Sequence, residues 1–403
     1  MDIVILQIHP SPELYCVTLR VEFIIILSNV WKHEKIHGVS SLFTRGELLR
    51  GVYKKSQQMA LDLREGLLLG LGNPLLDISA TVDSDFLNKY DLISNNAILA
   101  QEKHKPMYDE LIEHYKADFI AGGSVQNTMR VAQWFLKKPR VATYMGCVGM
   151  DKYSKILEDK ARADGLNVRY QYTNQEPTGT CAVLITGNER SLCANLAAAT
   201  CFSRSHIEEP ENKDLIEIAE YIYISGFFLT VSPETIQAIA QHAFEKNKMF
   251  MMNLSAPFLC EHYKKPMLAA LPYVDILFGN ETEAETFAKE NDFQITSRKE
   301  IVLKLSQIEK MNRKRQRIVI ITQGSKNILV AKDNTIIEFP AMKLPEEKIV
   351  DTNGAGDAFV GGFLAQLVQG RSIEVCIKCG IWAAAQIVQR SGCTYEGKPT
   401  FSP

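Results

Sequence analysis

The sequence has no long apolar run, no excess of one charge and few cysteines. No apolar segment reaches the roughly 18 residues that a membrane-spanning helix needs. The formal net charge is −2 over 403 residues, which argues against an overall nucleic-acid-binding surface. The nine cysteines are odd in number and scattered along the chain, unlike a disulfide framework. We therefore predict a cytoplasmic protein without a membrane or nucleic-acid partner.

The sequence also lacks a complete phosphate-binding loop with its lysine. Residues 392–398 approach that motif, but Pro399 stands where Ser or Thr is required, and too few residues follow to form a helix. Cys376 and Cys379 spell C-x-x-C inside an amphipathic helical pattern at 373–387. No second pair accompanies them, so buried thiols are a better interpretation than a metal or redox site.

A glycine-rich stretch stands out among the motifs that are present. Residues 351–363, DTNGAGDAFVGGF, follow an apolar pair and open an apolar helical pattern. A glycine turn at a helix start presents free backbone N–H groups at the positive end of the helix dipole, which suits an anion. Because an anion there would repel the carboxylate of Asp357, the presence of this carboxylate needs a reason. We interpret Asp357 as a general base that takes a proton from the attacking hydroxyl in phosphoryl transfer. The alternative is an ordinary acidic residue at a helix N-terminus.

Apolar runs alternate with helical patterns along most of the chain. This alternation is typical of β-α-β units. It predicts an α/β fold with a doubly wound, mostly parallel sheet flanked by helices. Buried strands are expected at 66–71, 141–149, 222–225, 250–254, 274–278 and 318–322, with helices at 233–245 and 266–270 between two pairs of them.

An acidic and amide-bearing segment follows one of these strands. Asn280 and Glu283 come directly after the strand at 274–278, and ligands gather at the carboxyl ends of parallel strands. The two side chains could hold a Mg²⁺ ion that keeps most of its water. Helix capping alone would also explain an Asn and a Glu at this spacing.

Seven further segments complete a resemblance to a known family. With the glycine-rich stretch, they resemble the ribokinase-like carbohydrate and nucleoside kinases from about Met59 to the end of the chain. The motifs N-P-L-L-D and N-L-S-A-P-F are most similar to the branch of that family that acts on adenosine. The segments are Gly72–Asp77, Ala121–Asn127, Thr178–Cys181, Asn188–Leu192, Gly226–Thr230, Asn253–Phe258 and Gly279–Glu283.

The resemblance implies ATP-dependent phosphorylation of the 5′-hydroxyl of adenosine to give AMP, in purine salvage. It implies a ribokinase-like kinase domain at 59–403 whose small β lid comes from about 78–100 and 170–198. Mg²⁺ is implied as cofactor and ATP as co-substrate. A monomer is implied as well, and no coiled-coil or repeat signal contradicts it.

The resemblance also assigns substrate-binding residues. Asp77 would accept hydrogen bonds from the two ribose hydroxyls, as suits a carboxylate facing a cis-diol. Phe228 and Phe258 would stack on the purine, although a buried Phe is more often simple core. The full set is Asn73, Asp77, Ile98, Leu99, Gly123, Ser124, Asn127, Cys181, Leu192, Ala194, Phe228, Phe258 and Asn353.

The phosphate end of the site follows from the same resemblance. The backbone N–H groups of Gly354, Ala355 and Gly356 would stabilise the charge on the transferred phosphoryl group together with Arg190, whose guanidinium suits oxygens. The alternative is that Arg190, like most exposed arginines, is simply solvated. ATP would lie near Thr322, Gly324, Ile381 and Val388, and Mg²⁺ would be held by Asn280 and Glu283.

Two other functions are compatible with these motifs. The nearer one is a kinase of the same superfamily that acts on another nucleoside or on a sugar. The Phe228 and Phe258 pair and the apolar lid weigh against a free sugar, which would need more hydrogen-bonding groups. The other is a non-catalytic nucleoside-binding protein. Binding alone would need neither Asp357 nor Arg190, and their presence argues against it.

Two segments lie outside this interpretation. Residues 1–58 match nothing in the family, and we expect them to be disordered or not needed for function. Within them, His33-Glu34-x-x-His37 fits the zinc-protease pattern but lacks a third ligand. The basic run at 313–317 could serve as a nuclear address, and a solvated loop is the simpler interpretation.

Overall fold

The structure is a computed structural model that describes residues 63–94, 96–187 and 189–402. The expected extension at 1–58 and its His33 and His37 pattern lie outside the described residues. Among the helices of the described chain, none combines the length and apolar character needed to cross a bilayer.

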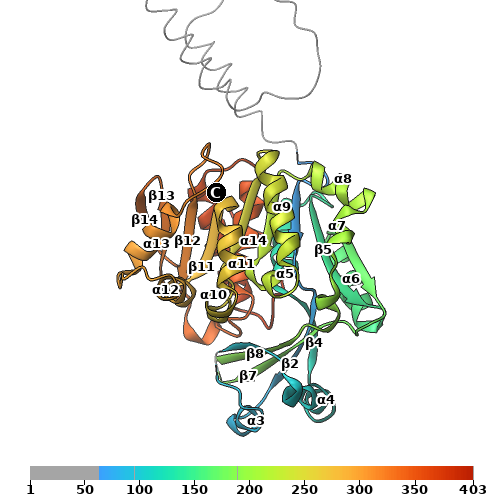
Figure 1. Cartoon of the computed structure of the whole chain (residues 1–403). Helices are drawn as coiled ribbons and strands as arrows, with labels where there is room; N and C mark the ends of the chain where they lie inside the picture. The colour runs from blue at the N-terminus through green and yellow to red at the C-terminus, as the bar shows by residue number, and fades with distance from the viewer. Residues whose placement is uncertain (1–62, 95, 188, 403) are drawn as a thin grey trace, which may run out of the picture. The chain divides into compact units, whose positions relative to one another are not determined.

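A nine-stranded sheet forms the centre of the described chain, in the order β14-β13-β12-β11-β10-β9-β1-β5-β6 (Figure 1). All neighbours from β6 to β12 pair in parallel, and β13 and β14 add an antiparallel edge. The strands are β1 Leu68–Leu71, β5 Ala142–Gly149, β6 Asn167–Thr173, β9 Tyr221–Ser225, β10 Met249–Asn253, β11 Ile276–Asn280, β12 Ile318–Gln323, β13 Lys326–Lys332 and β14 Thr335–Phe339.

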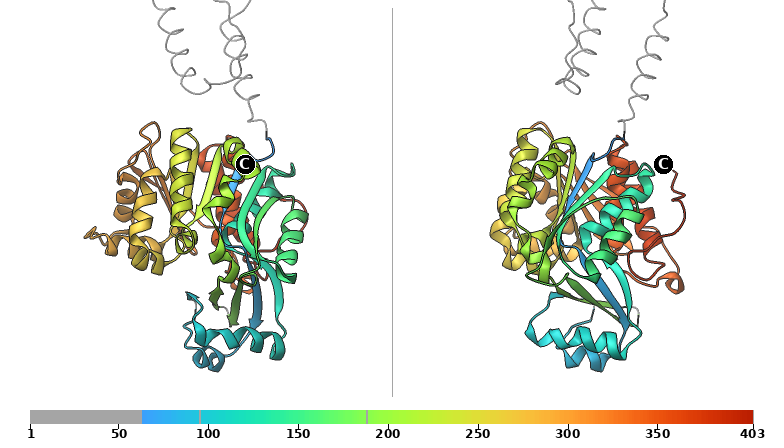
Figure 2. Two further views of the ribbon diagram at one scale, coloured as in Figure 1. Left: turned by 45° about the vertical axis from the view of Figure 1, so that its right-hand side comes forward. Right: turned by 90° about the vertical axis from the view of Figure 1, so that its right-hand side faces the viewer.

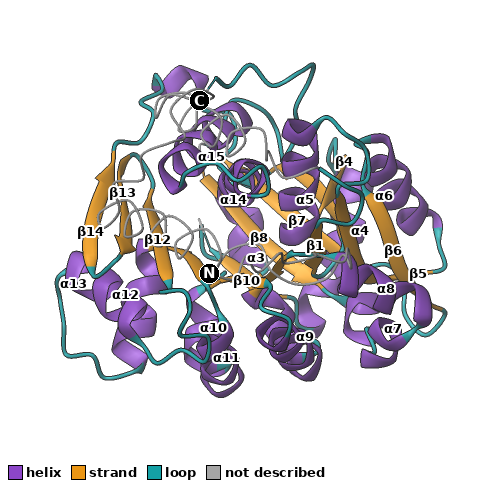
Figure 3. Ribbon diagram, turned by 90° about the horizontal axis from the view of Figure 1, so that it is seen from above, coloured by secondary structure: helices purple, strands orange, loops and turns teal. Residues whose placement is uncertain are grey.

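Helices cover both faces of this sheet (Figure 3). One face packs against α5 Ser124–Leu136, α6 Lys152–Ala163, α14 Ala355–Leu367 and α15 Ile373–Ile387. The other packs against α7 Arg204–Glu208, α8 Pro210–Ile218, α9 Pro233–Glu245, α10 Pro257–His262, α11 Lys264–Ala270, α12 Glu281–Glu290 and α13 Arg298–Gln307. Because both faces are buried, the central strands are apolar throughout, as β5 shows with all of its residues buried. The predicted fold class is confirmed.

A smaller five-stranded sheet, in the order β3-β8-β7-β2-β4, lies at one end of the large sheet (Figures 1 and 2). Its strands are β2 Leu75–Thr81, β3 Ala97–Leu99, β4 Asp118–Gly122, β7 Thr180–Thr186 and β8 Glu189–Asn195. The helices α3 Ser84–Lys89 and α4 Lys105–His114 pack on its outer face.

Two details of the predicted lid differ from the structure. β6 does not belong to the lid, because it pairs in parallel with β5 at the edge of the large sheet. Residues 118–122 form strand β4 of the smaller sheet, although the predicted lid ranges, 78–100 and 170–198, do not include them. Pairing with β2 decides this conformation, and local sequence does not show that partner.

A close helix contact positions the region of the glycine-rich stretch. Gly361 on α14 faces α5, where a β-carbon would lie 2.7 Å from the carbonyl oxygen of Thr128. Only glycine permits this approach without a shift of one helix. The contact brings the first turn of α14 beside the first turn of α5.

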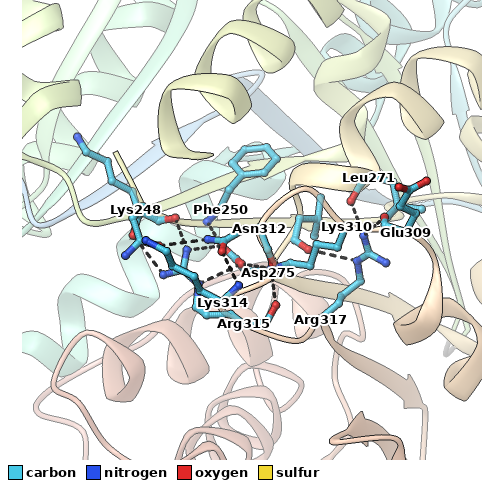
Figure 4. A network of polar contacts seen from close by, with 12 residues as sticks. Lys248, Phe250, Leu271, Asp275, Glu309, Lys310, Asn312, Lys314, Arg315 and Arg317 are labelled. Atoms are coloured by element: carbon cyan, nitrogen blue, oxygen red, sulfur yellow. Dashed lines mark hydrogen bonds and ion pairs between the residues drawn. The ribbon is translucent and has the colours of Figure 1, made fainter. Parts of the chain in front are cut away.

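A buried ionic network lies at the amino ends of the parallel strands (Figure 4). Asp275, directly before β11, is 3% exposed and accepts hydrogen bonds from Lys310 at 2.6 Å and from the backbone N–H of Phe250 at 3.0 Å. Arg315 contacts the same carboxylate at 3.1 Å. Arg317, 2% exposed, donates to main-chain carbonyls, including Leu271 at 2.7 Å. The basic run is therefore not a simple solvated loop, because Arg315 and Arg317 bind groups at the amino end of β11.

We expect Asp275→Asn to lower the free energy of unfolding by about 3 kcal/mol. The substitution removes the negative charge that pairs with Lys310 and Arg315 and leaves these cations without compensation. Urea denaturation measures the change. The control is Glu338→Gln, which breaks an exposed pair with Lys299 and should alter stability little. Equal losses in the two variants would contradict a special role for the buried network.

Candidate functional site

A cavity of about 370 Å³ lies where the carboxyl ends of the parallel strands face the smaller sheet. Its wall combines apolar and polar residues from strands, helix starts and loops of both sheets. Such a position, at strand ends and under a second sheet, is typical of ligand sites in α/β folds.

The structure brings most of the predicted substrate residues into this one wall. They come from segments as far apart as residues 73 and 353. Those that line the cavity are Asn73, Asp77, Ile98, Leu99, Gly123, Ser124, Asn127, Cys181, Leu192, Ala194, Phe258 and Asn353. Their individual contacts with a substrate stay predictions.

Asp357 occupies the first turn of α14 at the edge of the cavity. Ser124 Oγ donates to Asp357 Oδ1 at 2.7 Å, and Asn127 Nδ2 donates to Oδ2 at 3.1 Å. Burial raises the pKa of Asp357 to about 6, and these two hydrogen bonds act against that rise. The carboxylate is therefore ionised at neutral pH yet basic enough to accept a proton. Ser124 and Asn127, which the resemblance assigns to substrate binding, here orient this carboxylate.

A glycine turn precedes α14, as the sequence predicts, and we call residues 353–356 the cradle. Gly354 has φ of +75°, a conformation that favours glycine. Asp351 holds the turn, since its Oδ1 accepts the N–H of Asn353 and its Oδ2 the N–H of Gly392, both at 2.8 Å. Gly354 and Gly356 line the cavity, and Ala355 does not.

Arg190 is not in the cavity wall, although the sequence places it on the transferred phosphate. Its Nε lies 3.0 Å from Asp351 Oδ1, and its Nη2 donates to the carbonyl of Val350 at 2.5 Å. Both partners of this ion pair are buried. In this structure Arg190, on strand β8, therefore joins the smaller sheet to the base of the cradle.

Asp77 projects from β2 into the cavity that Asp357 also lines, and the charges of Asp357 and Asp351 both act on it. Burial raises the pKa of Asp77 to about 8, and repulsion from those two carboxylates adds to the rise. A β-carbon on Gly122 of the paired strand β4 would lie 2.3 Å from Asp77 Oδ1. The glycine thus leaves room for this carboxylate.

Phe228 does not face the cavity. Its side chain is 0% exposed and packs edge-on against Phe202 at 5.1 Å. Phe227 lines the cavity instead, 6.4 Å from the ring of Phe258. The two phenylalanines are adjacent in the short 3₁₀ helix Gly226–Thr230, so they point in different directions, and an F-F pair alone does not reveal which one faces outward.

Several residues that line the cavity were not predicted from the sequence. Asn253 and Ser225 end the strands β10 and β9, where the rule that ligands gather at carboxyl ends of strands could have found them. Asn253 Oδ1 accepts the N–H of Gly226 at 3.0 Å, so it also fixes the segment that carries Phe227. The other missed residues are Leu75, Ala97, Leu196, Thr230, Ser255, Phe278, Gly279, Ile320, Phe359 and Val360.

Asn280 and Glu283 line the cavity and cap α12 reciprocally. Glu283 Oε1 accepts from Asn280 Nδ2 at 2.8 Å, and Oε2 accepts the backbone N–H of Asn280 at 3.0 Å. Burial raises the pKa of Glu283 to about 7. The described residues hold no cluster of three metal-binding side chains. One buried carboxylate with free lone pairs fits a Mg²⁺ ion bound mainly by water and phosphate.

The predicted ATP residues are not all brought together. Thr322 lines the main cavity. Gly324, with φ of +55°, follows β12 outside the cavity wall. Ile381 lines a separate cavity of about 360 Å³. Val388 lines neither cavity, and its carbonyl accepts the N–H of Val350 at 2.8 Å, so it supports the turn that leads to the cradle.

Comparison with known proteins gives consistent matches. The pfkB carbohydrate kinase family matches residues 84–400. Adenosine kinase 2 of Arabidopsis thaliana is 52% identical over 338 residues, which cover 84% of this chain and 98% of that protein.

Solved structures are similar as well. The crystal structure of Anopheles gambiae adenosine kinase in complex with P1,P4-di(adenosine-5) tetraphosphate has a TM-score of 0.82 and 58% identity, covering 84% of this chain and 100% of that one. The Schistosoma mansoni adenosine kinase in complex with 2-fluoroadenosine has a TM-score of 0.81 and 37% identity, covering 83% and 99%.

We expect Asp77→Asn to stabilise the ligand-free protein as pH rises. Between about pH 4 and pH 8 the folded protein holds a proton on Asp77 that the unfolded chain has lost, so wild-type stability falls through this window. The gain of the variant over wild type should grow by at most about 1.4 kcal/mol per pH unit. Urea denaturation at pH 5, 6.5 and 8 measures it, and a pH-independent difference would contradict the effect of burial on Asp77.

Proposed function

The chain belongs to the pfkB family of carbohydrate kinases, and from this premise we propose that it transfers the γ-phosphoryl group of ATP to the 5′-hydroxyl of adenosine, producing AMP. One observation carries the proposal: a half-buried Asp357 with a raised pKa beside a glycine cradle, at the edge of a cavity lined by the substrate motifs. The similarity to adenosine kinases over more than four-fifths of the chain supports adenosine as the acceptor.

Adenosine lies under the smaller sheet in this proposal. The inner face of that sheet presents Leu75, Cys181, Leu192 and Ala194, an apolar surface suited to a purine. Phe227 and Phe258 supply aromatic surface from the large-sheet side. Asp77 and Asn73 accept and donate hydrogen bonds to the ribose hydroxyls; Asn73 Oδ1 is buried without a partner, as a group awaiting a donor would be.

The chemistry is assigned to Asp357 and the cradle. Asp357 takes the proton of the 5′-hydroxyl as that oxygen attacks the γ-phosphorus, and the bond to the ADP oxygen breaks. The N–H groups of Gly354, Ala355 and Gly356 donate to the phosphoryl oxygens at the start of α14, where the helix dipole favours negative charge. Arg190 could join them only by leaving Asp351.

Mg²⁺ is proposed as cofactor, held by Glu283 and Asn280 with water. When bound, it would neutralise phosphate charge. Glu283 is buried and its pKa is raised, so a nearby cation would favour the ionised carboxylate. ATP is proposed to extend from Thr322 toward Gly324 and the surface of α15 that carries Ile381.

We further propose a cytoplasmic monomer. The eight cysteines within the described residues are free, as suits a reducing compartment. A nuclear address at 313–317 is less favoured, because Arg315 and Arg317 are held by Asp275 and by main-chain carbonyls and are not free to be recognised in an extended segment.

The function is tested by incubating the full chain with ATP and Mg²⁺ and with adenosine, guanosine, cytidine, ribose or fructose in turn. AMP formed with strong preference for adenosine supports the proposal. Turnover of a sugar alone would leave the fold and the chemistry intact but refute the acceptor. Adenosine binding without turnover would indicate a nucleoside-binding protein.

We expect Asp357→Asn to lower kcat on the order of 10²–10⁴-fold, the usual range for loss of a general base. The Kd for ATP should change little, because Asp357 is assigned no contact with bound ATP. In the wild type, kcat should rise with pH through a value near 6, as Asp357 loses its proton. Steady-state kinetics and nucleotide titration measure both, and wild-type turnover in the variant would refute the mechanism.

Phe227→Ala and Phe228→Ala form a matched pair. Phe227→Ala removes aromatic surface from the cavity, so the KM for adenosine should rise about 10-fold while the folded protein stays stable. Phe228→Ala creates a cavity in the core and should lower the free energy of unfolding by about 3–5 kcal/mol. The reverse pattern, a KM effect only in Phe228→Ala, would contradict the observed orientation.

A further inference from the structure

Arg130 is a buried cation that the proposed chemistry does not use. It lies on α5, one turn beyond Asn127, and is 1% exposed. Its Nε pairs with Asp164 Oδ2 at 2.7 Å. Its Nη1 points the other way, toward Asn127 Oδ1 at 3.3 Å. One guanidinium therefore connects an ion pair at the end of α6 with the amide that contacts Asp357.

The direction of the Asn127 amide follows from this contact. An amide has an oxygen end that accepts and a nitrogen end that donates, and a guanidinium can only donate. Arg130 therefore favours the oxygen end on its own side. The nitrogen end is then left to donate to Asp357 Oδ2, at 3.1 Å. Without Arg130 the amide could turn over and place its oxygen against the carboxylate.

We propose that Arg130 is a positioning residue: through Asn127 Oδ1 it fixes the amide in the orientation that keeps the carboxylate of Asp357 ionised and aligned. This inference rests on the proposed role of Asp357 in phosphoryl transfer. Arg130 itself does not line the cavity, and its contact with the cavity wall is through Asn127.

Other contacts of Arg130 tie the same cation to the rest of the site. Nη1 also donates to the carbonyl of Ala121 at 3.1 Å, next to Gly122, which makes room for Asp77. It lies 3.4 Å from the carbonyl of Cys393, and a β-carbon on Gly354 would lie 2.9 Å from Cys393 Cβ. The guanidinium thus contacts the backbone behind the ribose site and behind the cradle.

Several titratable groups face Asp357, and the test must separate them. Asp77 comes from β2, Tyr223 from β9 and Cys393 from the segment after α15, and the charge of Asp357 affects the pKa of each. Glu283 on α12 shares the influence on Tyr223. Bound adenosine occupies Asp77, so kcat at saturating adenosine reports groups of the complex, with Asp357 as the base.

The experiment compares the pH dependence of kcat in the full-length wild type and in Arg130→Met. A turned amide would disfavour the ionised carboxylate, so the acid limb should move upward by roughly one pH unit. That shift lowers kcat about five-fold at pH 6 and leaves it nearly unchanged at pH 8.5. Arg130→Lys keeps a donor-only side chain and should retain the wild-type limb.

Matched variants separate positioning from stability. Asp164→Asn breaks the same buried ion pair but leaves Nη1 on Asn127, so it should lower the melting temperature without moving the limb. Arg130→Gln, which keeps a donor for Asp164 but can present either end of its amide, covers the case in which Arg130→Met does not fold. In an Asn127→Leu background, Arg130→Met should add no further shift.

The outcomes are distinct. An unmoved limb in Arg130→Met or Arg130→Gln, or an equal shift in Asp164→Asn, would show that Arg130 only stabilises the fold and would overturn the inference. A wild-type chain that forms no AMP from adenosine would instead overturn the proposed function.

Discussion

The site depends on one half-buried contact between two helices: the carboxylate of Asp357 in the first turn of α14, held by Ser124 and Asn127 in the first turn of α5. The contact is possible because Gly361 has no side chain. The two helices approach so closely that any side chain at this position would collide with the carbonyl oxygen of Thr128. Packing, and not local sequence, therefore aligns the proposed base with the cavity. The same packing shields the carboxylate from water, which raises its pKa toward neutrality.

Three acids of the cavity share this electrostatic condition. Burial raises the pKa of Asp77, Glu283 and Asp357, and within the described residues none of the three forms an ion pair, although the positive charge of Arg130 opposes the rise at Asp77. Carboxylates kept in this state cost folding stability when they ionise. At the opposite end of the strands, Asp275 is fully compensated by Lys310 and Arg315. Asp275 therefore helps to hold the sheet, whereas Asp77, Glu283 and Asp357 lie where the proposed substrates and Mg²⁺ would supply hydrogen bonds and positive charge.

The smaller sheet is joined to the cradle through a residue that serves the fold in this structure. Arg190 pairs with Asp351, which also holds the N–H groups of Asn353 and Gly392. If Arg190 leaves Asp351, the buried carboxylate of Asp351 loses its ion-pair partner. Movement of Arg190 to a phosphate therefore requires that another group take its place beside Asp351. The cradle, the strand pair behind Asp77 and the amide of Asn127 are similarly connected by Arg130. Buried cations therefore link the parts of a site that are far apart in the chain.

The sequence by itself determined the fold class, most strands of the large sheet and most of the cavity wall. The fold class and the strands follow from apolar periodicity, and the glycine turn before Asp357 follows from local chemistry, whereas most residues of the cavity wall follow from the resemblance to the ribokinase-like kinases. Only the tertiary structure decided that Phe227 and not Phe228 faces the cavity, that residues 118–122 form strand β4, that Ser124 and Asn127 contact Asp357, and that Arg190 pairs with Asp351. Each of these depends on a partner more than 20 residues away or on which side of a short helix is covered. Local propensity carries no information about such partners, because the free energy that selects them comes from burial and pairing in the assembled fold.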